Sequence, residues 1–195
     1  MHINVRQLPY SIILASQSPR RRELLKGLDI LFTVMTKDTP EDFPGDLKGG
    51  AIASYLSRRK AKAFADNELP EDYLLITADT IVCIDNHVLN KPASPAEAVN
   101  MLKTLSGNQH TVYTGVTIRT KQKEVTFCSA TDVWFRDLSE EEISYYLTKY
   151  KPYDKAGSYG VQEWIGYSAI SRIEGSYFNV MGLPTQQLYL ELYQF

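Results

Sequence analysis

Strand-like and helix-like segments alternate along the first third of the chain, and this alternation restricts the fold more than any other sequence feature. Tyr10–Ala15 is a short apolar run typical of a buried strand, and leucines recur at helical spacing within Pro19–Leu28. Phe32–Thr36 again has strand character, and we expect a helix from about Lys48 to Ala65. This β-α-β-α order predicts a mixed α/β fold.

The rest of the chain continues the mixture. Serine-led capping boxes predict helices after Ser94 and Ser139, and Pro184 is predicted to start a terminal helix. The expected strands are Leu74–Ile84, interrupted at Asp79-Thr80, a long hairpin of Thr111–Arg119 and Val125–Phe135, and a second hairpin of residues 168–173 and 176–181. Because no repeat or low-complexity linker occurs, we expect one folding unit over residues 10–195 after an N-terminal arm of residues 1–9.

Charge and composition exclude several classes of partner. The formal net charge is -2, which argues against nucleic-acid binding because such domains carry clustered basic excess. The apolar run "SIILA" is too short for a signal peptide or a membrane span. Cys83 and Cys128 lack metal-binding spacing and are interpreted as reduced core residues. We therefore expect a cytoplasmic protein with no membrane partner.

The stretch "LASQSPRRRELL", Leu14 to Leu25, places two serines and three arginines where a strand turns into a helix. Ser18 is expected as the N-cap and Pro19 as the first helical residue. A helix N-terminus offers unpaired N–H groups to phosphate oxygens, and arginines add bidentate donors. The stretch therefore indicates a phosphate site, and the alternative is an ordinary capped helix with solvated arginines.

A carboxylate lies inside the apolar run "LLITADTIVCI" at Asp79. A buried, unpaired charge costs several kcal/mol on the usual order-of-magnitude estimates, so something must compensate it, and a divalent metal with a triphosphate is one candidate. The alternative is a break between two strands at "ADT".

The stretch Pro152–Gln162, "PYDKAGSYGVQ", has the composition of a tight ligand-binding loop, or else of a plain connection. The histidines form no Ser/His/Asp pattern, which disfavours nucleophilic acyl transfer.

Seven motifs together resemble the Maf family of nucleoside triphosphate pyrophosphatases: "SQSPRRRELL", "SRRKA", "TADTIV", "LNKP", "GNQHTVYTGV", "DKAGSYGVQ" and "GSYFNVMGLP". The resemblance covers about Ser11 to the C-terminus. It implies an elongated α/β fold with two lobes around a central cleft, related to the inosine triphosphate pyrophosphatases. It also implies hydrolysis of a nucleoside triphosphate to the monophosphate and pyrophosphate with Mg or Mn, in the cytoplasm, often as a dimer.

The resemblance implies a role for individual residues of this chain. Ser16, Arg20 and Arg21 match the phosphate-binding opening, and Lys60 and Lys91 match the lysines that face the triphosphate. Asp79 matches the catalytic aspartate and, with Glu41, the metal-binding acids, although Pro40 stands where the family often has another acid. At the three selectivity positions the chain resembles the branch acting on dTTP and UTP, through Arg21, Thr80 and Gln162.

Two alternatives remain beside this reading. One is a nucleotide-binding regulator of cell division that senses triphosphates without hydrolysing them, and the other is a pyrophosphatase acting on 7-methyl-GTP. For a hydrolase, Arg20, Arg21, Lys60 and Lys91 would supply positive charge. Asp79 would either accept the proton of the attacking water or ligate the metal.

Overall fold

The computed structural model describes residues 8–85 and 87–195, so most of the predicted N-terminal arm and Asn86 lie outside the described residues. Within the described residues, one mixed sheet has the strand order β2-β1-β3-β5-β6-β7, and β4 pairs with β3. β1 pairs in parallel with β2 and with β3, whereas the β3–β4 and β6–β7 pairs are antiparallel. The strands are β1 (Ser11–Ala15), β2 (Thr33–Met35), β3 (Tyr73–Ile84), β4 (His87–Leu89), β5 (Gln109–Arg119), β6 (Glu124–Phe135) and β7 (Ile170–Glu174).

The helices begin where local capping chemistry predicts. Ser18, Ser94 and Ser139 are N-caps whose side chains accept a backbone N–H, and the Ser139 box is completed by Glu142. Pro184 differs slightly from expectation because it is the N-cap of the terminal helix. The helices are α1 (Pro19–Lys26), α2 (Gly50–Lys62), α3 (Pro95–Leu105), α4 (Glu140–Tyr150), α5 (Trp164–Ser168), α6 (Tyr177–Met181) and α7 (Thr185–Leu192), with short 3₁₀ turns at Asp66–Glu68 and Ala156–Ser158.

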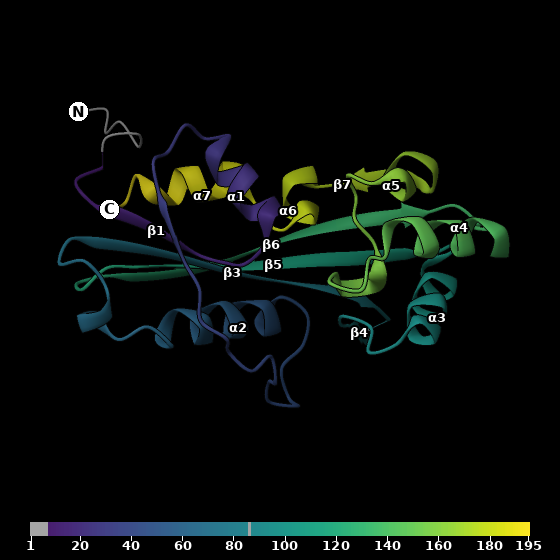
Figure 1. The fold of residues 1–195 in the computed structure, drawn as a ribbon, viewed down its shortest axis with the longest axis horizontal. Coiled ribbons are helices and arrows are strands. Elements are labelled where there is room, and N and C mark those ends of the chain that lie inside the picture. The colour runs from purple at the N-terminus through teal and green to yellow at the C-terminus, as the bar shows by residue number, and fades with distance from the viewer. Residues whose placement is uncertain (1–7, 86) are drawn as a thin grey trace. The chain divides into compact units, whose positions relative to one another are not determined.

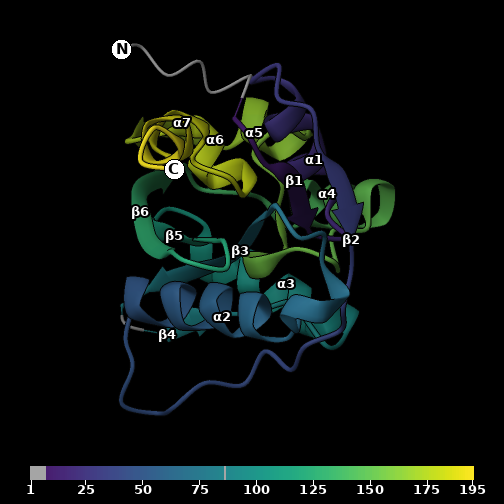
Figure 2. The same ribbon diagram turned by 90° about the vertical axis from the view of Figure 1, so that its left-hand side faces the viewer.

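The chain divides into two compact units. Unit 1 comprises the described residues up to Asp79 together with Thr114–Ser129 and Gly182–Phe195. Within it, α2 covers one face of the sheet, while α1 and α7 lie on the other (Figures 1 and 2). Gly115 permits close packing of α2, because a Cβ at this position would lie 2.3 Å from the Ala53 backbone. The core of this unit includes Ile13, Ala61, Phe64, Leu69, Tyr73 and Leu75.

Unit 2 comprises Thr80–Tyr113 and Ala130–Met181. Its core joins the end of β3 to one face each of α3 and α4, and it also takes in residues of β5 and β6. α3 contacts both α4 and the 3₁₀ turn at Ala156–Ser158. The members of this core include Val82, Ile84, Ala98, Leu102, Leu105, Val112, Val133, Phe135, Ile143, Tyr146 and Leu147.

Two sequence predictions are wrong. β3 runs unbroken from Tyr73 to Ile84, so Asp79 does not separate two strands. The second hairpin does not form either, because Tyr177–Met181 is the helix α6. Asn179 explains the helix: its backbone N–H is capped by Ser176 Oγ at 3.3 Å, and its buried amide donates to Val112 O at 3.1 Å.

Candidate functional site

Two serine hydroxyls shape the turn from β1 into α1. Ser16 is buried, and its Oγ accepts the backbone N–H of Ser18 at 3.2 Å. Ser18 Oγ accepts the N–H of Arg21 at 3.5 Å, as an N-cap should. The predicted phosphate-binding opening is therefore a pre-formed helix N-terminus, with the partial positive charge that favours anions.

The arginines that follow have different surroundings. Arg21 is partly buried; its Nε donates to Gly182 O at 2.7 Å and its Nη1 to Ala78 O at 2.8 Å. Arg22 Nη2 lies 3.4 Å from both Ser16 O and Gln17 O. Burial lowers the pKa of Arg21, and the Asp79 charge opposes that effect. Arg21 thus joins α1 to the strand residue that precedes Asp79.

Asp79 is compensated by a lysine. It is 6% exposed, and its Oδ1 contacts Lys60 Nζ from the last turn of α2. Lys60 Nζ also lies 3.1 Å from Glu41 Oε1, so one ammonium joins the two acids that the resemblance assigns to a metal. The structure therefore brings Glu41, Lys60 and Asp79 together within unit 1.

The donor set near Asp79 suits a hard cation only in part. Among the described residues, no group of three or more His, Cys, Asp or Glu side chains could hold a metal ion. Magnesium, however, is commonly bound by one or two carboxylates, with water and substrate phosphates completing its coordination. Glu41 and Asp79, which already converge on one cationic group, fit that requirement.

The segment that carries Glu41, residues 38–46, is held from the surface of α2 and is called here the Glu41 segment. Arg59 Nη1 donates to Asp42 O at 2.6 Å and lies 3.0 Å from Asp42 Oδ1. The hydrogen bond from Arg59 lowers the pKa of Asp42. Just before the segment, Lys37 Nζ donates to Ala63 O at 2.9 Å. The contacts of Arg59 with Asp42 and of Lys37 with Ala63 are exposed, whereas the side chain of the neighbouring Lys60 is only 19% exposed.

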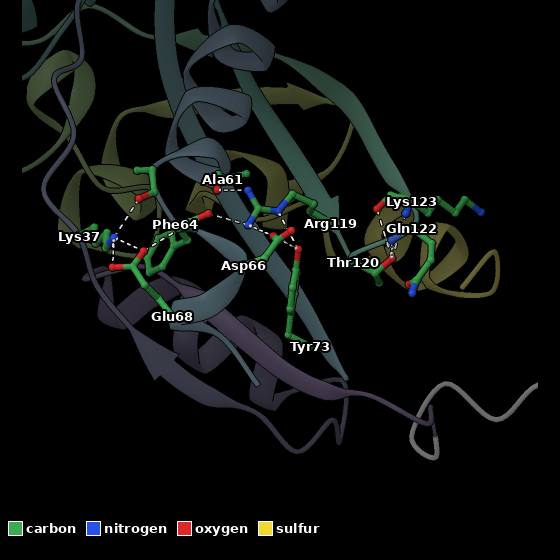
Figure 3. A network of polar contacts seen from close by, with 12 residues as sticks. Lys37, Ala61, Phe64, Asp66, Glu68, Tyr73, Arg119, Thr120, Gln122 and Lys123 are labelled. Atoms are coloured by element: carbon green, nitrogen blue, oxygen red, sulfur yellow. Dashed lines mark hydrogen bonds and ion pairs between the residues drawn. The ribbon is translucent and has the colours of Figure 1, made fainter. Parts of the chain in front are cut away.

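The end of α2 that carries Lys60 is fixed by a residue that the sequence analysis did not single out. Arg119, at the end of β5, donates to Ala61 O at 2.6 Å and to Phe64 O at 2.7 Å (Figure 3). Its Nε lies 3.2 Å from Tyr73 OH. These bonds join Arg119 to one carbonyl in the last turn of α2 and to one just beyond its C-cap, at the helix end where backbone carbonyls favour a cation. No local pattern around Arg119 indicates this role, because its partners lie far away in the sequence.

Arg20 lies in unit 1 with Arg21, whereas Thr80, Lys91 and Gln162 belong to unit 2. Thr80 follows Asp79 in β3, so strand alternation points the two side chains to opposite faces of that strand. Lys91 is exposed and follows Asn90, whose carbonyl accepts the N–H of Gly157 at 3.3 Å. This bond ties the chain next to Lys91 to residues 155–163, called here the Gln162 segment.

Gln162 has an unsatisfied acceptor. Its Oε1 is buried and has no hydrogen-bond partner among residues 8–85 and 87–195. Buried polar atoms are normally paired, so a lone buried acceptor calls for an explanation. A ligand that donates an N–H group would supply the missing partner.

Buried polar contacts surround Gln162 along the chain. Tyr146 OH, from α4, accepts the Gly160 N–H at 3.0 Å and contacts Glu163 Oε2. Glu163 Oε1 lies 3.1 Å from Lys155 Nζ, and Lys155 is only 9% exposed. Of these residues, only Lys155 and Gly160 lie in the stretch Pro152–Gln162 whose composition indicates a ligand-binding loop. Tyr146 is a core position in the helical pattern, so its polar role could not be distinguished from packing.

Comparison with known proteins gives a consistent result. A family model described as Maf-like protein matches residues 11–195. A protein of Bacteroides thetaiotaomicron named dTTP/UTP pyrophosphatase is 54% identical over 184 residues, covering 94% of this chain and 95% of its own. Proteins with the same name from Porphyromonas gingivalis and Parabacteroides distasonis are each 53% identical, over 95% of this chain and 94% and 96% of their own. In the described part of the chain, no helix combines the length and apolar character needed to cross a membrane.

Proposed function

The chain belongs to the Maf family, and we propose that it hydrolyses dTTP and UTP to the nucleoside monophosphate and pyrophosphate. Relatives at 54% and 53% identity carry the name of that activity. The observation that carries the proposal is a buried Asp79 held against Lys60, with Glu41 on the same ammonium. A site for polyphosphate hydrolysis needs such a carboxylate among cationic groups, because positioning and electrostatics dominate the chemistry.

The phosphate chain is held by charge and by a helix end in this proposal. The α1 N-terminus with Ser16 offers donors, and Arg20, Arg21, Lys60 and Lys91 supply positive charge as the pyrophosphate group leaves. Arg21 is supported by its backbone anchors at Ala78 O and Gly182 O, which restrict its guanidinium orientation. An anchored cation stabilises developing negative charge without reorganising during the reaction.

We propose that Glu41 and Asp79 hold one Mg or Mn ion. When bound, such an ion neutralises phosphate charge and lowers the pKa of water. Lys60 Nζ contacts both carboxylates, so the two side chains that would hold the ion already converge on one point. Asp79 either accepts the proton of the attacking water or serves as a ligand, and both roles require its carboxylate.

Base selection is assigned to Gln162, with Arg21 and Thr80. Uracil and thymine present an N3–H donor between two carbonyl groups, and an amide can accept from that N–H while donating to a carbonyl. The buried, unpaired Oε1 of Gln162 supports this assignment because it is an acceptor without a donor. Cytosine has an acceptor at N3, and 7-methylguanine presents two N–H donors that a carboxylate suits better. Each mispaired polar contact costs about 1 to 3 kcal/mol.

The direct test is pyrophosphate release from dTTP, UTP, CTP, GTP and 7-methyl-GTP, with Mg and with Mn. We expect the highest kcat/KM for dTTP and UTP, and for Gln162→Glu a lower UTP turnover with a narrower gap to 7-methyl-GTP. Nucleotide binding without pyrophosphate release would support the regulator instead. If the wild type prefers 7-methyl-GTP, the proposed pyrophosphatase activity stands, but the assignment to the branch that acts on dTTP and UTP is wrong. We also propose a cytoplasmic location and a dimeric assembly, both supported by family membership alone.

A further inference from the structure

The proposed base selection requires that the Gln162 amide keep one orientation. A glutamine amide that rotates freely offers either its oxygen or its NH₂ group, so it would accept uracil and cytosine alike. Holding the backbone on both sides of Gln162 fixes the point from which its side chain extends, and so restricts the rotamers that can present Oε1 to the base. The structure contains a polar network, beyond the residues assigned above, that contacts both sides.

Tyr146 connects the residues that flank Gln162. Its ring is fully buried on α4, and its hydroxyl accepts the Gly160 N–H at 3.0 Å. The same hydroxyl donates to the Glu163 carboxylate. Burial, together with the Glu163 carboxylate, raises the pKa of Tyr146, so the hydroxyl remains a donor at neutral pH. One atom thus contacts the chain two residues before Gln162 and one residue after it.

A buried charge pair holds the other end of this network. Glu163 Oε1 lies 3.1 Å from Lys155 Nζ, and the Lys155 and Glu163 side chains are only 10% and 17% exposed. Desolvating two charges cancels much of their attraction, so such a pair contributes little net stability. What it does provide is a defined geometry for the groups that it joins.

The main chain of the segment is shaped around the same carboxylate. Glu163 N–H donates to Gly160 O at 2.9 Å, which closes a turn with Gln162 inside it. A Cβ on Gly160 would lie 2.9 Å from Glu163 Cδ and 3.1 Å from its oxygens. Glycine at this position therefore leaves space for the Glu163 carboxylate to fold over the turn.

We propose that Tyr146 and Glu163 are positioning residues for base selection, which hold the turn around Gln162 so that its Oε1 faces the N3–H of uracil or thymine. Neither residue is given a contact with substrate. The inference rests on the proposed role of Gln162 as the base reader, and it adds the residues that make this reader selective.

The test compares the UTP/CTP ratio of kcat/KM in wild type, Tyr146→Phe and Tyr150→Phe. Tyr146→Phe removes the hydroxyl and keeps the buried ring, and we expect the ratio to fall about 10-fold, as for one mispaired polar contact. Tyr150→Phe is the matched control, because Tyr150 lies one turn further along α4 and its ring stacks on Tyr146 at 5.2 Å between centroids. Its ratio should be unchanged. The UTP/CTP ratio measured on one preparation does not depend on the fraction of the enzyme that is folded. A variant that only destabilises the fold would therefore leave this ratio unchanged.

A double-mutant cycle with Gln162→Ala separates the two levels of the proposal. If Tyr146 acts through Gln162, Tyr146→Phe should not change the UTP/CTP ratio further in the Gln162→Ala background, and Glu163→Gln should behave in the same way. If Gln162→Ala changes the ratio but Tyr146→Phe and Glu163→Gln do not, the positioning inference is wrong and the proposed function stands. If Gln162→Ala leaves the ratio unchanged, the base-reader assignment itself fails. Equal effects of Tyr146→Phe in both backgrounds would also reject the inference.

Discussion

The Glu41 segment and the Gln162 segment carry two proposed functional residues, but they are held by opposite kinds of contact. The Glu41 segment is mostly exposed and is joined to α2 by the Asp42–Arg59 and Glu41–Lys60 ion pairs. The Gln162 segment is held by Tyr146, Lys155 and Glu163, which are largely buried. Surface ion pairs contribute little and rearrange readily, whereas buried polar networks specify one geometry.

This difference matches what each segment is proposed to do. A segment that exchanges a lysine partner for a cation and a polyphosphate must change its contacts, so weak ion pairs suit it. A segment that distinguishes uracil from cytosine must keep one orientation, so a satisfied buried network suits it. Four predictions test this contrast, from the largest expected effect to the smallest.

The largest effect is expected for Asp79→Asn. Loss of a general base typically lowers the rate about 10² to 10⁴-fold. We expect kcat for UTP to fall by that amount while the UTP/CTP ratio of kcat/KM stays constant, because base selection is assigned to Gln162, Arg21 and Thr80 and not to Asp79. Steady-state kinetics over a range of Mg concentrations checks this result. Recovery at high Mg would indicate a ligand role, and near wild-type turnover would reject the catalytic assignment.

Acid should affect the Gln162 segment through His110. Burial lowers the pKa of His110 from 6.5 to about 4, and its Nε2 lies 2.7 Å from the hydroxyl of Tyr159, which belongs to that segment. Between pH 6.5 and about 4, His110 therefore binds a proton in the unfolded chain but not in the folded chain. The contribution of His110 to the free energy of unfolding is fully present above pH 6.5 and is lost as the pH drops toward 4. The loss reaches about 3 kcal/mol.

Melting temperatures of wild type and His110→Gln at several pH values between 7 and 4 measure this contribution. The variant should lose less stability on acidification than the wild type does. If the melting temperatures of the two proteins fall in parallel with pH, His110 does not contribute the expected pH dependence. The contrast between the two segments would then be supported only by their contacts in the structure.

A pair of Gly→Ala substitutions compares the two segments directly. Gly160→Ala places a methyl group 2.9 Å from Glu163 Cδ, and Glu163 is held by Tyr146 and Lys155, so we expect a loss of about 1 to 3 kcal/mol. Gly45→Ala, in the Glu41 segment, meets nothing within 4 Å and should be neutral or stabilise by up to about 1 kcal/mol. Urea unfolding of both variants checks the contrast, and equal effects would contradict it.

The smallest effect is expected for Asp42→Asn, which makes the same chemical change as Asp79→Asn on a surface pair. It weakens the contact from Arg59 to the Glu41 segment but leaves Glu41 beside Lys60. We expect kcat/KM to fall less than about two-fold, and the difference to disappear near 1 M salt. A loss comparable to that of Asp79→Asn would mean that the segment needs a rigid anchor.

Local signals were sufficient for much of the fold. Ser18, Ser94 and Ser139 are confirmed as N-caps because a cap depends on residues within one helical turn. The interruption predicted at Asp79 is wrong: β3 runs through Asp79 without a break, and the buried carboxylate is compensated by Lys60, 19 residues away in the sequence. The helix α6 was missed because its hydrogen bonds to Val112 and Thr131 come from residues distant in sequence.

The sequence by itself determined which chemical groups the chain can offer: capped helix starts, an acid within an apolar strand, cationic side chains in several motifs and a glutamine at the end of a tight loop. Only the tertiary structure decided which of these groups meet. Arg21 reaches Ala78 and Gly182 across separations of 57 and 161 residues, and Lys60 reaches Asp79 across 19. Contacts at such separations form only when the packed core has offset the entropy of closing the intervening chain, and that balance is a property of the whole fold.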